Sequence, residues 1–193
     1  MKNNEDRATL PSVVLPDGVE TIDANQFKGC GALTSVTIPK GVKTIGANAF
    51  KDCFGLTEIV LPGGVEEIGE GAFDNCYSLT SVVMPKSVKT IGEKAFAGCA
   101  LLADFVLPEN VEEIGSNAFE ECVSLTSAVI PEGMKRIESY AFCGCRALTS
   151  VVLPQGLEIV DRYAFCKCES LSNVEFPQSL LAIGRNAFED CGR

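Results

Sequence analysis

The feature that most constrains this chain is a repeat of 23 residues that never slips. The dipeptide Ala-Phe recurs at positions 49, 72, 95, 118, 141, 164 and 187, and Gln26-Phe27 is the variant first copy. Eight prolines and eight cysteines keep the same register: Pro16, Pro39, Pro62, Pro85, Pro108, Pro131, Pro154 and Pro177, and Cys30, Cys53, Cys76, Cys99, Cys122, Cys145, Cys168 and Cys191. A unit this short cannot bury its apolar side chains alone, so consecutive copies must stack. The period therefore predicts a solenoid.

Each copy combines a strand pattern with a segment of helical spacing. In "LTSVTIP", Val36 and Ile38 alternate with polar residues as in a half-buried strand, which Pro39 ends because it lacks an amide donor. One such strand per coil predicts a parallel sheet on the concave face. In the segment that follows, four apolar residues share one face of a helix: Ile45, Ala49, Phe50 and Cys53. We therefore expect an α/β repeat solenoid of about eight coils, with short helices on the convex face.

Composition and charge exclude several classes of function. The chain has 193 residues, of which 46% are hydrophobic and 22% charged, as in a folded domain. We expect a polar N-terminal extension over residues 1–9 and a single solenoid domain over residues 10–193. The net charge of −10 argues against nucleic acid or an anionic membrane as a partner. The apolar runs are far shorter than the ~20 residues of a membrane span.

No residue pattern points to catalysis, a metal or a cofactor. The chain contains no histidine, which removes the commonest general base and the commonest metal ligand. The repeated cysteines share the inward side with the phenylalanines, so we interpret them as small buried residues rather than nucleophiles. We expect a protein that is not an enzyme and that uses no cofactor.

Only Cys143 and Cys166 lie outside the cysteine register, each one residue after a repeated phenylalanine in neighbouring copies. They should stack as neighbours, and a disulfide needs Cα atoms about 4.4–6.8 Å apart. Because outer segments of a solenoid can be spread further than that, a Cys143–Cys166 bridge and unpaired thiols both stay open. Zinc is disfavoured, because the second cysteine of each pair, CGC and CKC, points inward.

A charge pattern alternates in sign from copy to copy. The residue after the repeated valine position reads Glu20, Lys43, Glu66, Lys89, Glu112, Lys135 and Glu158. With neighbouring strands ~4.8 Å apart, each charge would lie between two opposite charges. We interpret the alternation as fixing the stacking register, and a solvated face with chance alternation is the alternative.

The outward side of the strands carries the candidate binding surface. If Val36 and Ile38 point inward, their strand neighbours point outward onto the concave face, where five consecutive copies carry a valine. An apolar stripe of this kind, about 25 Å long, often marks a partner site, although valine also simply suits a strand. The predicted partner-binding residues are Thr57, Glu58, Val60, Thr80, Ser81, Val83, Asp104, Val106, Thr126, Ser127, Val129, Thr149, Ser150 and Val152.

The repeat L-x-x-V-x-[IL], followed by I-G-x-x-A-F-x-x-C, resembles the BspA-like leucine-rich repeat family of bacterial and protist surface proteins. The match covers Leu10 to Cys191. It departs from ordinary leucine-rich repeats because Pro39 and Gly41 occupy the stretch where asparagine is usual. The resemblance implies a right-handed coil that serves as a non-enzymatic scaffold for adhesion and protein recognition, at the cell surface or secreted. Its partner would be a protein ligand such as a host or matrix protein.

Two further expectations concern the role of the chain and its ends. The alternative to recognition is a structural spacer segment of a larger surface protein, with no ligand of its own. The polar N-terminus has no apolar core of a secretory signal. The chain stops just after Cys191 without a polar cap, so we expect a piece of a longer array, or self-association through the concave face or the uncapped ends.

Overall fold

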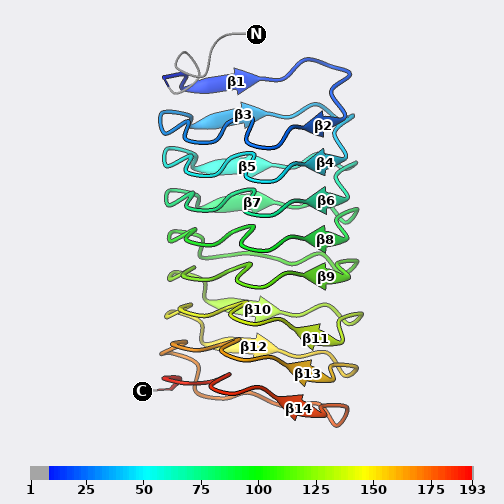
Figure 1. Ribbon diagram of the computed structural model, residues 1–193, viewed down its shortest axis with the longest axis vertical. Coiled ribbons are helices and arrows are strands. Elements are labelled where there is room, and N and C mark those ends of the chain that lie inside the picture. The colour runs from blue at the N-terminus through cyan, green and yellow to red at the C-terminus, as the bar shows by residue number, and fades with distance from the viewer. Residues whose placement is uncertain (1–8, 193) are drawn as a thin grey trace.

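Two strands of different length form in the coils of this solenoid (Figure 1). The computed structural model describes residues 9–192, which wind into a parallel β-solenoid of about seven turns. The long strands cross the coil in one direction and the short strands return in the other (Figure 1). The structure has about seven turns, where about eight coils were predicted. The N-terminal extension predicted for residues 1–9 lies outside the described residues except for Thr9.

The first strand of a coil is three residues long, and we call the outward side of these strands the long-strand face. They are β1 (Ser12–Val14), β3 (Ser35–Thr37), β5 (Glu58–Val60), β7 (Ser81–Val83), β10 (Ser127–Val129) and β12 (Ser150–Val152). β1 pairs with β3, β5 with β7 and β10 with β12, all in parallel and in the register of the repeat. This face therefore consists of three strand pairs rather than the one sheet that was predicted.

The second strand of a coil has two residues, too few for an alternating pattern to reveal it. These strands are β2 (Thr21–Ile22), β4 (Thr44–Ile45), β6 (Glu67–Ile68), β8 (Thr90–Ile91), β9 (Glu113–Ile114), β11 (Arg136–Ile137), β13 (Ile159–Val160) and β14 (Ala182–Ile183). They form a five-stranded sheet in the order β2-β4-β6-β8-β9 and a three-stranded sheet in the order β11-β13-β14. The short strands thus carry the more continuous ladder between coils.

A glycine after the short strand allows the coils to approach closely. The Gly92 amide donates to the Ile68 carbonyl of the preceding coil at 2.8 Å. A Cβ atom at Gly92 would lie 2.7 Å from the Glu70 nitrogen, far inside normal contact. In the coil that begins the second short-strand sheet, Glu138 occupies this position and β9 does not pair with β11. Asp161 occupies the same position in the following coil, where β11 and β13 do pair and the Asp161 amide bonds to Ile137 O at 2.9 Å, so a side chain at this position does not by itself break the ladder.

Stacked phenylalanine rings form the core. The rings of Phe27, Phe50, Phe73, Phe96, Phe119, Phe142, Phe165 and Phe188 stack in sequence with centroids 5.2–5.5 Å apart and planes within 10°. A buried ring contributes about 150–250 Å² of buried surface, and a stacked pair adds about 0.5–1.5 kcal/mol. The ring stack therefore runs the length of the described solenoid and joins its coils into one core.

The helices predicted for the convex face do not form, and residues 9–192 contain no helix at all. Asn48 and Asp52 adopt left-handed φ values of 55° and 60°, and two such residues only four positions apart interrupt any helix. The Lys51 amide bonds to the Asn48 carbonyl within a tight turn, while the Phe50 amide bonds to Ala72 O of the next coil. The backbone is thus satisfied by short turns and by bonds between coils, instead of by bonds within a helix.

The sequence carried a signal for these turns. The first left-handed position is asparagine or glycine in five copies, and these residues tolerate positive φ best: Asn25, Asn48, Gly71, Asn117 and Asn186. The spacing of the inward residues suggested a helix only because the repeated turns also return those residues to the same side. No helix in the described residues is available to cross a membrane.

Candidate interaction surface

The long-strand face presents every one of the predicted partner-binding residues to solvent. The set consists of Thr57, Glu58, Val60, Thr80, Ser81, Val83, Asp104, Val106, Thr126, Ser127, Val129, Thr149, Ser150 and Val152. We call Val60, Val83, Val106, Val129 and Val152 the valine stripe, and their exposed fractions range from 54% to 80%. The side chains that precede them on the strands, such as Ile59, are buried, except for Val82, which is half-buried. The inward and outward assignment along these strands therefore agrees with the burial of each side chain.

The threonines of this face also form hydrogen bonds between neighbouring coils. The Thr80 hydroxyl donates to the Thr57 carbonyl of the preceding coil at 3.0 Å, and the Thr149 hydroxyl donates to Thr126 O at 3.1 Å. The amides of the same two residues donate to the same carbonyls at 2.8 and 2.9 Å. These hydroxyl protons are thus used in holding neighbouring coils together, which leaves the threonines less to offer a ligand.

Three junctions between coils lack this threonine bond. Thr57 makes no such bond to the coil before it, Ala103 has no hydroxyl, and the equivalent residue of the last coil is Ser172. The long strands do not pair at these three junctions, nor at the junction between the coils of Ala103 and Thr126, where the threonine bond is present. In the coil of Ala103, the large Phe105 replaces an aliphatic residue and packs at a tilt against the stacked rings of Phe96 and Phe119, with centroid distances of 5.3 and 5.0 Å.

We call the three junctions that lack the threonine bond the open junctions, and each of them contains a surface cleft. The sequence did not predict these clefts. The first, of about 360 Å³, is lined by Glu58 and Val60. The second, of about 530 Å³, is lined by Val83, Asp104 and Val106. The third, of about 300 Å³, is lined by Val152 and Glu175 among others. Every cleft therefore combines a carboxylate with at least one residue of the valine stripe.

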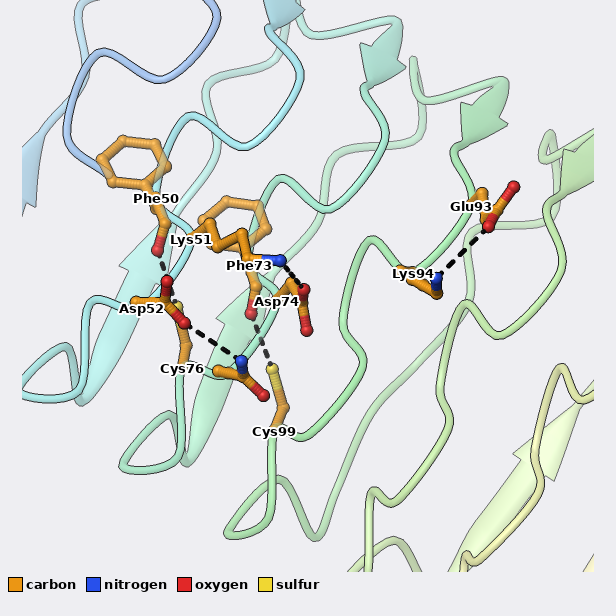
Figure 2. Close-up of polar contacts among 10 residues, drawn as sticks. Phe50, Lys51, Asp52, Phe73, Asp74, Cys76, Glu93, Lys94 and Cys99 are labelled. Carbon is orange, nitrogen blue, oxygen red and sulfur yellow. Dashed lines mark hydrogen bonds and ion pairs between the residues drawn. The ribbon is translucent and has the colours of Figure 1, made fainter. Parts of the chain in front are cut away.

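The opposite side of the coils carries polar cross-links between neighbours (Figure 2). Lys51 Nζ lies 2.6 Å from Asp74 Oδ2, and Asn75 donates to Asp52 Oδ1 at 3.0 Å. The hydrogen bond to Asp74 is the main reason why the pKa of Lys51 is raised above 10.5. These contacts join one coil to the next.

The structure pairs Cys143 with Cys166 as a disulfide, with Cα atoms 4.6 Å apart and both side chains buried. That separation lies within the range a disulfide can span. Cys143 and Cys166 lie this close because turns, instead of helices, form this side of the described coils. The turns bond directly from coil to coil, and the Gly144 amide donates to Cys166 O at 2.7 Å.

The repeated cysteines are thiols with a defined hydrogen bond, and all of them except the partly exposed Cys191 are buried. Cys99 Sγ donates to the Phe73 carbonyl of the preceding coil at 3.3 Å (Figure 2), and six other copies make the same bond at 3.1–3.2 Å. Burial raises the pKa of the Cys53 and Cys122 thiols to about 12. A thiol with so high a pKa is a poor nucleophile at neutral pH. Within residues 9–192 no cluster of His, Cys, Asp or Glu could hold a metal ion.

The alternating charges form few contacts. Lys135 Nζ lies 3.3 Å from Glu158 Oε1, and this is the one pair of the alternating series within 4.0 Å in the described chain. Both side chains are largely exposed, so the pair contributes little to stability. The hydrogen bonds between coils hold the stacking register more directly than these charges do.

Comparisons with known proteins identify relatives of the whole repeat array. The sequence matches the family described as BspA type leucine rich repeat region, in six copies over residues 5–126 and 66–193. Its structure is similar to that of a leucine-rich repeat protein of T. pallidum, with 36% identity, a TM-score of 0.81, and coverage of 89% of this chain and 87% of the other. A leucine-rich cell surface protein of Faecalibacterium prausnitzii shares 27% identity at a TM-score of 0.51, over 93% of this chain and 70% of the other. No curated protein matches.

Proposed function

The chain belongs to the BspA-type leucine-rich repeat family, and from this premise we propose that it is a non-enzymatic protein-recognition or adhesion module that binds a partner on its long-strand face. The valine stripe carries the proposal. Five consecutive coils each leave a valine more than half exposed at one position, although the polar serines and threonines beside them suit solvent better. A contiguous apolar surface of this kind gains free energy when a partner covers it.

The partner is a protein, such as a host or matrix protein, and the setting is the cell surface or a secreted form. The Faecalibacterium relative is described as a cell surface protein, which supports this setting. The cysteines are compatible with it: seven of the eight free thiols in the described residues are buried, and the exceptional Cys143 and Cys166 lie in position for a disulfide. Buried thiols resist oxidation, so their number does not require a reducing compartment.

The alternative is a structural spacer of a larger surface protein. One observation favours it: the threonine hydroxyls of the long-strand face already serve the neighbouring coil. A spacer predicts that this face tolerates substitution without loss of any binding.

A random peptide library displayed on phage tests the proposal. Peptides would be selected on the wild-type protein and then measured against the variant V83E/V106E/V129E. The control variant L101E/L181E/I183E changes three other exposed apolar residues, none of which occupies an outward position of the long strands. We expect peptides that bind the wild type and the control but not the stripe variant. Selection of no peptide, or only of peptides that bind all three proteins equally, supports the spacer instead.

A further inference from the structure

The charges on the long-strand face are of one sign. Among the outward positions of the long strands and their equivalents in the two coils without a long strand, the only charged residues are Glu58, Asp104 and Glu175. No lysine or arginine occupies any of these positions in the described residues. The outward positions of the long-strand face therefore carry negative charge alone.

These three carboxylates are unpaired. Within residues 9–192 none of them forms an ion pair, whereas Asp74, Glu109 and Glu158 each pair with a lysine of a neighbouring coil. Lys86 also lines the second cleft, but its ammonium group is paired with Glu109, with Nζ and Oε1 2.8 Å apart. A carboxylate beside an apolar surface gains most from a cation that the partner brings, because desolvation on binding strengthens the attraction.

The carboxylates coincide with the clefts. Glu58, Asp104 and Glu175 each line one of the three open junctions, together with a valine of the stripe. Glu58 and Asp104 occupy the same repeat position two coils apart, a separation of about 10 Å on the usual strand spacing. Arginine and lysine fit such sites, because their methylene stems cover apolar surface while the charged group reaches the carboxylate.

We infer that the partner on the long-strand face is a basic and apolar polypeptide segment, whose arginine or lysine side chains enter the three clefts while its apolar side chains cover the valine stripe. This inference rests on the proposed recognition function and specifies its partner. Arginine is favoured over lysine, since its planar guanidinium can bind a carboxylate through two hydrogen bonds.

The test uses defined peptides instead of an unidentified ligand. A fluorescein-labelled dodecapeptide of alternating arginine and valine is titrated onto the full chain and followed by fluorescence anisotropy, beside a peptide in which glutamine replaces every arginine. We expect the arginine peptide to bind about tenfold or more tightly than the glutamine peptide at physiological salt. In the variant E58Q/D104N/E175Q the preference should fall to about threefold or less.

A matched control separates binding of arginine in the clefts from general attraction to the negative charge of the protein. The variant E20Q/E66Q/E112Q removes three exposed carboxylates from the segments that lead into the short strands, and it should keep the full preference for the arginine peptide. Equal losses in the two variants would mean diffuse attraction to an acidic protein, and would overturn the inference.

The remaining outcomes distinguish this inference from the proposed function. If both peptides bind the wild type equally and both lose binding in V83E/V106E/V129E, the face recognises apolar chains, so the proposed function stands and the basic partner is refuted. If the arginine peptide does not bind, the basic partner is refuted as well, and the phage selection alone then decides whether the face recognises proteins.

Discussion

Lys51 and Asp74 meet across two neighbouring coils, with Nζ and Oδ2 2.6 Å apart, at the same repeat positions that Cys143 and Cys166 occupy four coils further along. One position in the turn thus joins adjacent coils by an ion pair in one part of the solenoid and by two sulfur atoms in another. The repeat therefore fixes the geometry of this contact, and the side chains decide its chemistry.

This equivalence predicts that a second disulfide can be introduced. In the variant K51C/D74C, the new cysteines should occupy the geometry of Cys143 and Cys166, whose Cα atoms lie 4.6 Å apart, and should oxidise in air. Mass spectrometry of a non-reduced digest would detect the linked peptides. Two alkylatable thiols at positions 51 and 74 after oxidation would mean that the two contacts differ in backbone geometry.

The Cys143–Cys166 pair should stabilise the oxidised protein. It closes a loop with a sequence separation of 23 residues, for which the loss of unfolded-state entropy corresponds to about 3 kcal/mol. Urea unfolding with and without reductant measures the difference. The variant C143S/C166S should be insensitive to reductant, and an equal insensitivity of the wild type would show that its two thiols are unpaired.

Close approach of the coils should make Gly92 intolerant of a side chain. The change G92A places a Cβ atom 2.7 Å from backbone of the preceding coil and should lower the free energy of unfolding by about 1–3 kcal/mol. G63A is the matched control, because a Cβ atom there meets nothing within 4 Å. Chemical denaturation compares the two, and equal stability of both variants would contradict the close contact.

The buried thiols should make the protein sensitive to alkali. An unfolded thiol ionises near its ordinary pKa of 9.0, while burial raises the pKa of Cys53 and Cys122 to about 12 in the folded state. Between these values the unfolded chain releases protons that the folded chain retains, so the free energy of unfolding falls as the pH rises. The contribution is fully present below pH 9. The slope should be smaller in C53A/C122A, and an unchanged slope would locate the effect elsewhere.

The sequence alone was sufficient to predict the periodic part of this structure. The period identified the solenoid, and the alternation around Val36 and Ile38 assigned the inward and outward sides correctly. The helix prediction for Ile45 to Cys53 was wrong because the pattern of inward residues is the same for a helix as for repeated turns. The residue types at Asn48 and Asp52 carried the information that separates the two.

The clefts could not be predicted from the repeat, because they depend on departures from it. They open where individual coils lack a bond, as at Ala103, whose coil also packs the larger Phe105 into the core. The effect of one residue on strand pairing depends on the packing of its neighbours. The consensus sequence of the repeat does not contain this information. The unpaired state of Asp104 likewise appears only when the distances to its neighbours are known.

The most direct test of the recognition function is the binding isotherm of one phage-selected peptide, measured on the wild type and on V83E/V106E/V129E. Thermal unfolding of both proteins first establishes that the variant is folded. The three valines are exposed, so the variant should unfold at the same temperature as the wild type. We predict that it binds the peptide about a hundredfold more weakly, since charges replace the apolar contact surface. Equal affinity of the two folded proteins would contradict recognition on the long-strand face and would leave the spacer as the function of this solenoid.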